Sequence, residues 1–215
     1  MIRLFTGYDD REAVGWHVFC QSVIEKTSGP VAIIPLSGKT DGTNAFTLAR
    51  FLVPSLCEFQ GWAIFADGAD MLLRCDLAEL WALRDERYAV QVVQHDYKPK
   101  HARKYIGTAM EADNGAYPRK NWSSLVLWNC GHKDNAWLTR DAVLAAPGPA
   151  LHRFSWTKQI GALPEQWNVL DELGKDPDAK LVHYTNGIPA FKHYRNAPHA
   201  TEWREKLTRV LNGRQ

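Results

Sequence analysis

The sequence contains no long hydrophobic run and no strong excess of charge. No stretch of its 215 residues approaches the roughly 20 apolar residues that span a bilayer. The first ten residues, MIRLFTGYDD, lack the apolar core of a signal peptide. A net charge of +2 is too small to indicate nucleic acid or an anionic membrane as a partner. We therefore expect no membrane span and no nucleic-acid partner.

Cysteine is scarce, and its spacing excludes the common metal-binding patterns. No CxxC pair occurs, and each cysteine lies in an apolar context, which is typical of reduced core thiols and not of a zinc site. This usage predicts a reducing, cytoplasmic location. The four cysteines are Cys20, Cys57, Cys75 and Cys130.

Internal repeats, low-complexity tracts and interdomain linkers are also missing, which predicts one domain over residues 1–215. The hydrophobic content of 45% is ample for a packed core. Nine tryptophans are more than a core of this size needs, and they suggest aromatic side chains in a cleft as well.

The order of the predicted elements indicates an α/β fold. Apolar runs at 2–6, 31–36 and 62–66 predict strands, and the periodic stretches at 11–26 and 46–59 predict helices between them. Parallel strands joined by right-handed crossovers, with helices on both faces of the sheet, explain this alternation.

The second half of the chain contains further strands and one long irregular stretch. Strands are predicted at 88–93, 122–129 and 181–184, and helices at 135–144 and 201–211. The stretch 95–121 has no periodicity and is rich in Lys, His, Tyr and Gly. Such a stretch within a compact domain is more often a functional loop than a simple connection.

The most informative stretch is Trp62–Trp81. Its apolar strand stops at two acidic residues, Asp67 and Asp70, and Asp76 is predicted to cap the helix that follows. Ligands of open α/β sheets bind at the carboxyl ends of the strands, and a hard divalent cation relieves the repulsion between two carboxylates. A polar strand end with an Asx-turn explains the same pattern. The stretch alone leaves both interpretations open.

Four segments together resemble a GT-A glycosyltransferase of family 8, the group of glycogenin and bacterial galactosyltransferases. These segments are LFTGYDDREAVGWHVFCQSV, ARFLVP, IFADGADMLLRCDLAELW and HYTNGIPAFKHY. They extend over most of the chain. The resemblance implies a GT-A-like, Rossmann-like α/β fold with a mostly parallel sheet and helices on both faces.

The resemblance also implies a set of site residues. Asp67, Asp70 and His183 would bind Mn²⁺ or Mg²⁺, and Arg50 would orient Asp67 or contact the donor. Lys192 would place a positive charge on the leaving diphosphate, and Gln159 would lie near the reacting carbon. Arg50, Lys192 and Gln159 are thus the catalytic candidates. The residues expected to bind the donor are Thr6, Gly7, Tyr8, Asp9, Arg50, Asp67, Gly187 and Lys192.

The chain departs from the family pattern at two places. The family has Asp-x-Asp, whereas this chain has Asp67-Gly68-Ala69-Asp70. Residues three apart in a strand do not share a face, so both carboxylates reach one ion only if the chain turns at Gly68, which a glycine permits. In the late segment, Ala190-Phe191 stands where Pro-Trp is usual.

The implied reaction is transfer of a sugar from a nucleoside diphosphate donor, a UDP-sugar, to the hydroxyl of a carbohydrate or other acceptor, with retention. Two alternatives remain open. A nucleotidyltransferase also uses paired carboxylates at a strand end. A catalytically inactive nucleotide- or sugar-binding protein of the same fold would explain the altered motifs. From the residues alone, His183 is also compatible with a hydrogen-bonded core histidine, and Lys192 with a surface lysine.

Overall fold

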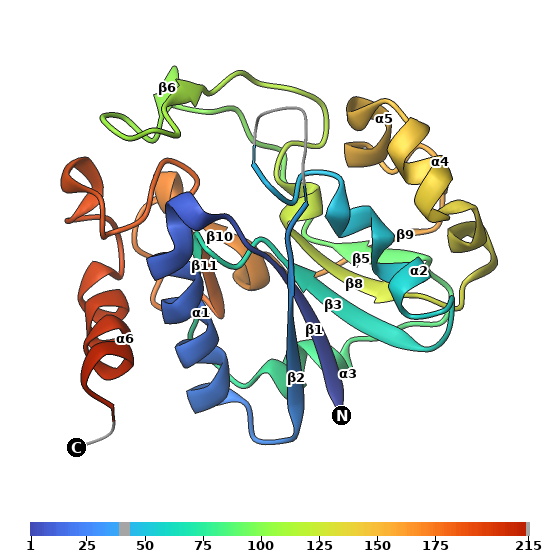
Figure 1. Cartoon of the computed structure of the whole chain (residues 1–215), viewed down its shortest axis with the longest axis horizontal. Coiled ribbons are helices and arrows are strands. Elements are labelled where there is room, and N and C mark those ends of the chain that lie inside the picture. The colour runs from blue at the N-terminus through green and yellow to red at the C-terminus, as the bar shows by residue number, and fades with distance from the viewer. Residues whose placement is uncertain (39–43, 214–215) are drawn as a thin grey trace.

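A computed structural model describes residues 1–38 and 44–213 of the chain. Its larger sheet has the strand order β2-β1-β3-β8-β5-β9 (Figure 1). All its strands run parallel to one another except β8, which is antiparallel to both β3 and β5. The fold is therefore α/β with a mostly parallel sheet, as predicted. Its strands are β1 (Ile2–Gly7), β2 (Val31–Leu36), β3 (Trp62–Ala66), β5 (Val90–Val92), β8 (Leu125–Asn129) and β9 (Ile160–Ala162).

A smaller sheet lies beside the carboxyl end of β3. It consists of β10 (Val169–Leu170), β11 (Leu181–His183) and β4 (Met71–Leu73), with β4 antiparallel to β11. The register pairs His183 with Met71, so the histidine lies directly beside the acidic segment that ends at Asp70. A two-stranded hairpin, β6 (Arg103–Lys104) and β7 (Ala112–Asp113), forms within the irregular stretch.

Six α-helices and several short 3₁₀ turns connect the strands in the described part of the chain. The α-helices are α1 (Ala13–Lys26), α2 (Val53–Leu56), α3 (Leu77–Ala82), α4 (Arg140–Ala145), α5 (Gly148–His152) and α6 (Ala200–Asn212). The 3₁₀ turns are η1 (Asp10–Glu12), η2 (Ala49–Leu52), η3 (Trp122–Ser124), η4 (Lys133–Trp137), η5 (Glu165–Asn168), η6 (Asp171–Leu173) and η7 (Lys192–Tyr194).

Two helix predictions need correction. The single helix predicted over 46–59 is instead the 3₁₀ turn η2 followed by the four-residue α2. Pro54 lies in the first turn of α2, where its missing N–H costs nothing. The helix predicted over 135–144 is a 3₁₀ turn and then α4, which starts where the Thr139 side chain accepts a hydrogen bond from the N–H of Ala142. The predicted cap at Asp76 is confirmed, since its carboxylate accepts from the N–H of Ala78 at 2.8 Å.

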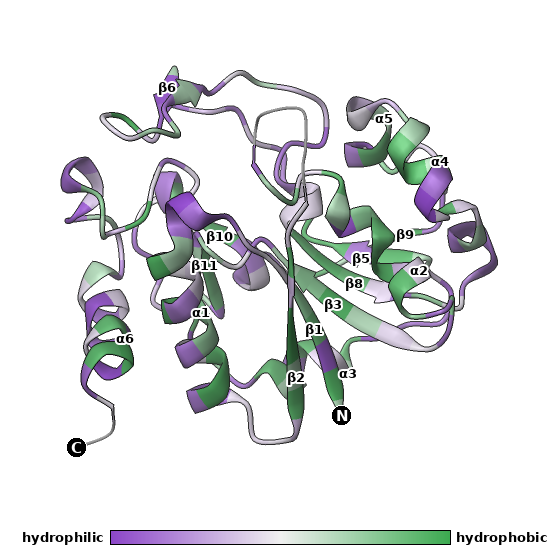
Figure 2. Cartoon of the chain, viewed as in Figure 1, coloured by the Kyte–Doolittle hydropathy of each residue, from purple (hydrophilic) through white to green (hydrophobic). Residues whose placement is uncertain are grey.

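The core lies on both faces of the larger sheet, whose strands are mainly hydrophobic (Figure 2). Alternate residues point to opposite sides: Leu4 and Ile64 pack with α1 and α3, whereas Phe5 and Phe65 pack with η2, α4 and α5. Burying each large apolar side chain contributes roughly 1.5–3 kcal/mol. Both faces are thus covered, and the edge formed by the strands' carboxyl ends is left for a site.

Helix α6 is joined to α1 by apolar packing and by a buried ion pair. Glu25 accepts from Lys206 Nζ at 2.5 Å, and both side chains are less than a tenth exposed. Arg209 pairs with the other carboxylate oxygen at 3.0 Å.

Replacing Glu25 with alanine is expected to lower the free energy of unfolding by about 1.5–3 kcal/mol, because the Lys206 ammonium loses the charged acceptor that compensates its burial. Urea denaturation measures the change. Glu205→Ala, at an exposed position of the same helix, is the control and should change the free energy by less than about 0.5 kcal/mol. Equal effects of the two substitutions would contradict a stabilising role for this pair.

Candidate active site

The turn that follows β3 brings two carboxylates to one place. Gly68 has a φ of +81°, and the N–H of Met71 donates to the Gly68 carbonyl at 2.9 Å. The chain therefore reverses between Asp67 and Asp70, and their side chains do not have to obey the alternation of a strand. The turn that this three-residue separation requires is present.

Asp67, Asp70 and His183 converge in this turn. One ligand atom from each lies within 4.8 Å of the other two, and His183 Nε2 lies 3.3 Å from Asp70 Oδ2. Ligands bound about 2.1–2.4 Å from a single divalent ion have this separation. The other oxygen of Asp70 is buried and has no hydrogen-bond partner among the described residues. The three side chains thus fit a cation such as Mn²⁺ or Mg²⁺.

The orientation of His183 is set by Asn168. The Asn168 amide nitrogen donates to Ser124 Oγ at 2.8 Å and to the Asn121 carbonyl at 3.3 Å, so its oxygen faces His183 Nδ1 at 3.0 Å. Nδ1 therefore donates to Asn168, and Nε2 is the ring nitrogen that faces Asp70 and the site. This arrangement, in which one ring nitrogen is held and the other faces the site, is typical of metal-binding histidines.

Arg50 is buried and holds Asp67 in place. Its guanidinium lies 2.6 Å from Asp67 Oδ1 and also donates to the carbonyls of Ser123 and Thr47, each at 3.1 Å. It packs over the rings of Phe46 and Phe65. Of the two roles predicted for Arg50, the geometry favours orienting Asp67.

The electrostatics of the two carboxylates differ. Burial raises the pKa of Asp67 to about 6, because it outweighs the attraction of Arg50, and repulsion from Asp70 adds to the rise. Burial also opposes ionisation of Asp70, but the adjacent His183 lowers its pKa below the usual value.

A cleft of about 720 Å³ opens over these residues. The irregular stretch 95–121 contributes much of its lining. Tyr105 connects this stretch to the acidic turn: it has a φ of +56°, and its hydroxyl donates to Asp70 Oδ2 at 3.2 Å. A left-handed conformation at a bulky residue is costly and is often found at functional sites. Other lining residues are Glu12, Lys104, Lys120, Asn121, His152 and Thr185.

Sequence reasoning did not identify Glu12, Tyr105 or Lys104 individually, and the only signal for Tyr105 and Lys104 was their place in the long irregular stretch. Lys120 belongs to the basic and aromatic segment 117–122, which the sequence offers either as a contact for an acceptor hydroxyl or phosphate or as a rigid loop wall. Glu12 is almost fully buried, and its Oε1 has no hydrogen-bond partner among the described residues.

The predicted donor-binding residues of the first strand lie beside the cleft but do not line it. Thr6 is buried and accepts from Trp16 Nε1 at 2.5 Å, and Gly7 lies against the Phe46 ring. The Tyr8 ring packs edge-on against Trp16. Asp9 accepts from the Arg11 backbone and guanidinium and from the N–H of Ala45. These hydrogen bonds, that of the Arg11 side chain above all, lower the pKa of Asp9 to about 2.

The structure does not bring Gln159 or Lys192 to the cleft. Gln159 immediately precedes β9, which runs parallel to β5, so it lies at the opposite edge of the sheet from Asp67, with an exposed side chain. Lys192 begins η7 and is exposed. Gly187 is buried with a φ of +149°, beneath the ring of Tyr194. The turns that follow β11 carry Lys192 outward, which the sequence spacing alone did not reveal.

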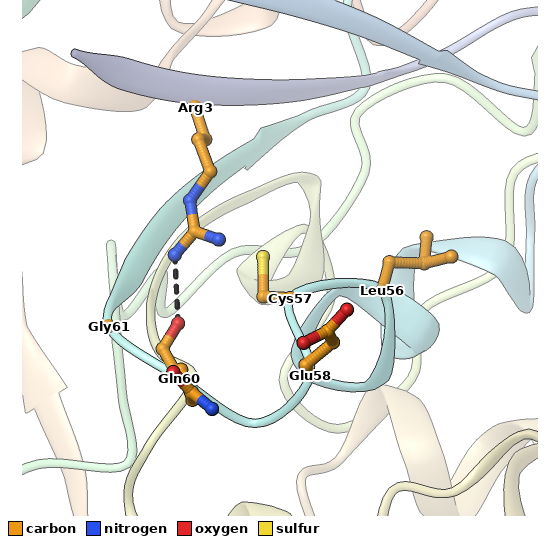
Figure 3. Close-up of a pocket in the computed structure, with 6 residues that line it drawn as sticks. All are labelled: Arg3, Leu56, Cys57, Glu58, Gln60 and Gly61. Atoms are coloured by element: carbon orange, nitrogen blue, oxygen red, sulfur yellow. Dashed lines mark hydrogen bonds between the residues drawn. The ribbon is translucent and has the colours of Figure 1, made fainter.

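A second pocket, of about 440 Å³, lies at that opposite edge (Figure 3). Arg3 and Glu58 are its charged lining residues, and the Arg3 guanidinium donates to the carbonyls of Gln60 and Trp62 at 2.8 and 2.9 Å. Within the described residues, the cluster of Asp67, Asp70 and His183 is the one group of three metal-ligating side chains, and this pocket contains none of them.

Helix α1 supports the acidic turn through a glycine. A Cβ atom added to Gly15 would lie 2.0 Å from the carbonyl oxygen of Ala69, between the two carboxylates. Gly15→Ala is therefore expected to displace the turn and to weaken Mn²⁺ binding at least about tenfold, since site geometry tolerates only small shifts. Isothermal titration with Mn²⁺ measures this. Gly29→Ala, where an added Cβ meets nothing within 4 Å, should bind as the wild type does, and equal affinities for all three proteins would refute the prediction.

The fold is that of GT-A glycosyltransferases. No protein-family model matches the chain, but solved structures do. The chain superposes on the galactosyltransferase LgtC, solved with donor and acceptor sugar analogues, with a TM-score of 0.65, 13% identity and coverage of 100% of this chain and 98% of that one. The bifunctional glycosyltransferase WbbM superposes with a TM-score of 0.66 and 15% sequence identity over 96% of this chain. GlyE of Streptococcus pneumoniae superposes with a TM-score of 0.63 and 12% sequence identity over 98% of this chain. The chain spans only 49% of WbbM and 62% of GlyE.

Among curated sequences, Protein CDI of Arabidopsis thaliana is 39% identical over 227 aligned residues, which cover 95% of this chain and 85% of that protein. The chain therefore belongs to the Protein CDI family. None of the helices in the described residues has the length and apolar character needed to cross a membrane.

Proposed function

We propose that this protein is a metal-dependent glycosyltransferase that moves a sugar from a nucleoside diphosphate donor, a UDP-sugar in the first instance, to a hydroxyl acceptor. The observation that carries the proposal is the convergence of Asp67, Asp70 and His183 within 4.8 Å, in a cleft at the carboxyl end of β3. Ligands of α/β sheets bind at this edge. The GT-A fold supports the assignment to sugar transfer, and a carbohydrate is the acceptor class we propose first.

Each residue of the site has a role in this proposal. Asp67, Asp70 and His183 would hold Mn²⁺ or Mg²⁺, and an imidazole in the set favours Mn²⁺. When bound, the ion stabilises the negative charge that develops on the departing diphosphate. Arg50 keeps Asp67 oriented, and Asn168 keeps Nε2 of His183 directed at the site.

Transfer with retention at the anomeric carbon is part of the proposal, as the resemblance to family 8 implies. The family 8 assignment itself is proposed on the four sequence segments. We also propose that the donor side of the cleft is supported by residues that lie just behind the ones lining it. These residues are Thr6, Gly7, Tyr8, Asp9 and Gly187. A reducing, cytoplasmic location is proposed from the four free cysteines.

One alternative has a specific observation in its favour. Gln159 and Lys192, two of the three residues expected to take part in catalysis, lie outside the cleft. The second candidate is therefore a protein that binds a nucleotide or sugar without catalysing a reaction. A nucleotidyltransferase is a further outcome to test, and it would release pyrophosphate in place of a nucleoside diphosphate.

The test is a thermal-shift titration with UDP, GDP, ADP and CDP, each in Mn²⁺ and in EDTA. A ligand at about 100 times its Kd stabilises the native state by about 2.7 kcal/mol, which raises the Tm of a chain of this size by roughly 5–10 °C. We expect such a shift for UDP with Mn²⁺ and not with EDTA. No shift with any diphosphate would contradict the proposal.

A further inference from the structure

Lys120 is a buried cation on the wall of the cleft. Its side chain is only 7% exposed. Its Nζ donates to the Gly115 carbonyl at 3.0 Å and lies 4.8 Å from the centre of the Tyr117 ring. No carboxylate of the described residues lies within ion-pairing distance of it. An ammonium has three donors, so most of its hydrogen-bonding capacity remains for another partner.

Lys104 is a second cation beside it. It lies on β6 with its Nζ 5.4 Å from the centre of the Tyr105 ring, lines the same cleft, and has no ion-pair partner among the described residues. Burial, with a smaller contribution from repulsion by Lys104, lowers the pKa of Lys120 to about 8, and attraction to Glu172 opposes both. Lys104 also acts electrostatically on Glu12, Asp67 and Asp70. Its charge therefore acts on both the acidic turn and Lys120.

Two arginines that line this cleft are paired with carboxylates. Arg11 pairs with Asp9 at 2.7 Å, and Arg50 pairs with Asp67 at 2.6 Å. Lys104 and Lys120 form no such pair with a carboxylate of the described residues. Burying a cation that lacks a counter-charge is unfavourable, and an anionic ligand held between the lysines would remove both the desolvation cost and their repulsion.

We propose that Lys104 and Lys120 form a binding site for a phosphate-type anion, next to the cluster of Asp67, Asp70 and His183. The source of the phosphate rests on the proposed function: it is either the diphosphate of the donor or a phosphate group on the acceptor. A metal held by the acidic turn and an anion held by the lysines complement each other in charge. Lys104, whose charge acts on the acidic turn as well as on Lys120, would contact whichever phosphate lies nearer to the metal.

Isothermal titration of Lys104→Met and Lys120→Met with inorganic pyrophosphate tests the site itself. Each variant is expected to bind at least about tenfold more weakly than the wild type, because a charge-assisted hydrogen bond is lost. Lys133→Met is the matched control: Lys133 is exposed in η4, beyond the end of β8 that lies at the opposite edge of the sheet. Lys120→Arg keeps the charge and should retain most of the affinity, which separates loss of charge from loss of packing.

Two further probes identify the source of the phosphate. If it is the donor, UDP with Mn²⁺ loses affinity in both Met variants. If it is the acceptor, UDP with Mn²⁺ binds normally and glucose 6-phosphate, titrated in its presence, loses affinity. Should wild type, variants and control bind pyrophosphate equally, or the wild type not bind it, the lysine site is refuted. If pyrophosphate shows the expected pattern but UDP does not bind in Mn²⁺, the lysine site stands and the proposed function fails.

Discussion

Asp70→Asn is expected to lower the rate of sugar transfer by roughly 10²–10³-fold, the range found when one preorganised electrostatic contact is removed from a site. The substitution is nearly isosteric, and the amide oxygen can still accept from the Tyr105 hydroxyl, which now donates to Asp70 Oδ2 at 3.2 Å. What it removes is the negative charge. The buried Oδ1 has no partner among the described residues. In the variant its position is taken by the amide NH₂ group, which is a poor cation ligand.

The measurement is the release of UDP from a UDP-sugar under saturating Mn²⁺, with the Tm recorded for each protein. His183→Ala should show a loss of similar size, because it removes another ligand of the same cluster. Asp178→Asn, at an exposed position, is the carboxylate control and should keep full activity. Full activity in both Asp70→Asn and His183→Ala would refute the metal assignment.

Arg50→Met is expected to reduce the free energy of unfolding by roughly 3–5 kcal/mol, the usual cost of removing one partner of a buried ion pair. Methionine fills much of the space against Phe46 and Phe65, so the loss comes mainly from charge. Asp67 would be left beside Asp70 without the guanidinium that lies 2.6 Å from it. The carbonyls of Thr47 and Ser123 would also lose their donor.

Urea denaturation of the single variant and of the double variant Arg50→Met with Asp67→Asn measures this effect. The second change neutralises the isolated carboxylate and should recover part of the lost stability. Arg140→Met, with a side chain that is 76% exposed, controls for removal of an arginine and should change the stability by less than about 0.5 kcal/mol. A double variant less stable than Arg50→Met alone would contradict the ion-pair explanation.

The parts of this fold that local rules determine could be predicted from the sequence. Apolar runs gave β1, β2 and β3, because a buried parallel strand needs continuous hydrophobic residues. Asp76 was identifiable as a cap because capping depends on residues two or three apart. The turn at Gly68 followed from geometry, since two carboxylates three residues apart cannot meet on a regular strand.

The parts that depend on distant contacts could not be predicted in the same way. Tyr105 reaches Asp70 from 35 residues away, and no periodic pattern in 95–121 marks it. Asn168 orients His183 through a contact between different elements. The order of the chain suggested that Gln159 lies near the reacting carbon. Because β9 runs parallel to β5, Gln159 instead lies at the edge of the sheet opposite Asp67. Lys192 was placed by motif spacing, whereas Lys104 and Lys120 reach the cleft through tertiary packing.

The most direct test of the central claim is to incubate the wild-type protein with a panel of nucleotide sugars and a mixed carbohydrate acceptor pool, and to identify the released nucleotide by mass spectrometry. We predict release of a nucleoside diphosphate, UDP first, in Mn²⁺ and none in EDTA, together with a glycosylated acceptor. Binding of the donor without release would establish the inactive binding protein, and release of pyrophosphate would establish nucleotidyl transfer. Either result would contradict the assignment as a glycosyltransferase.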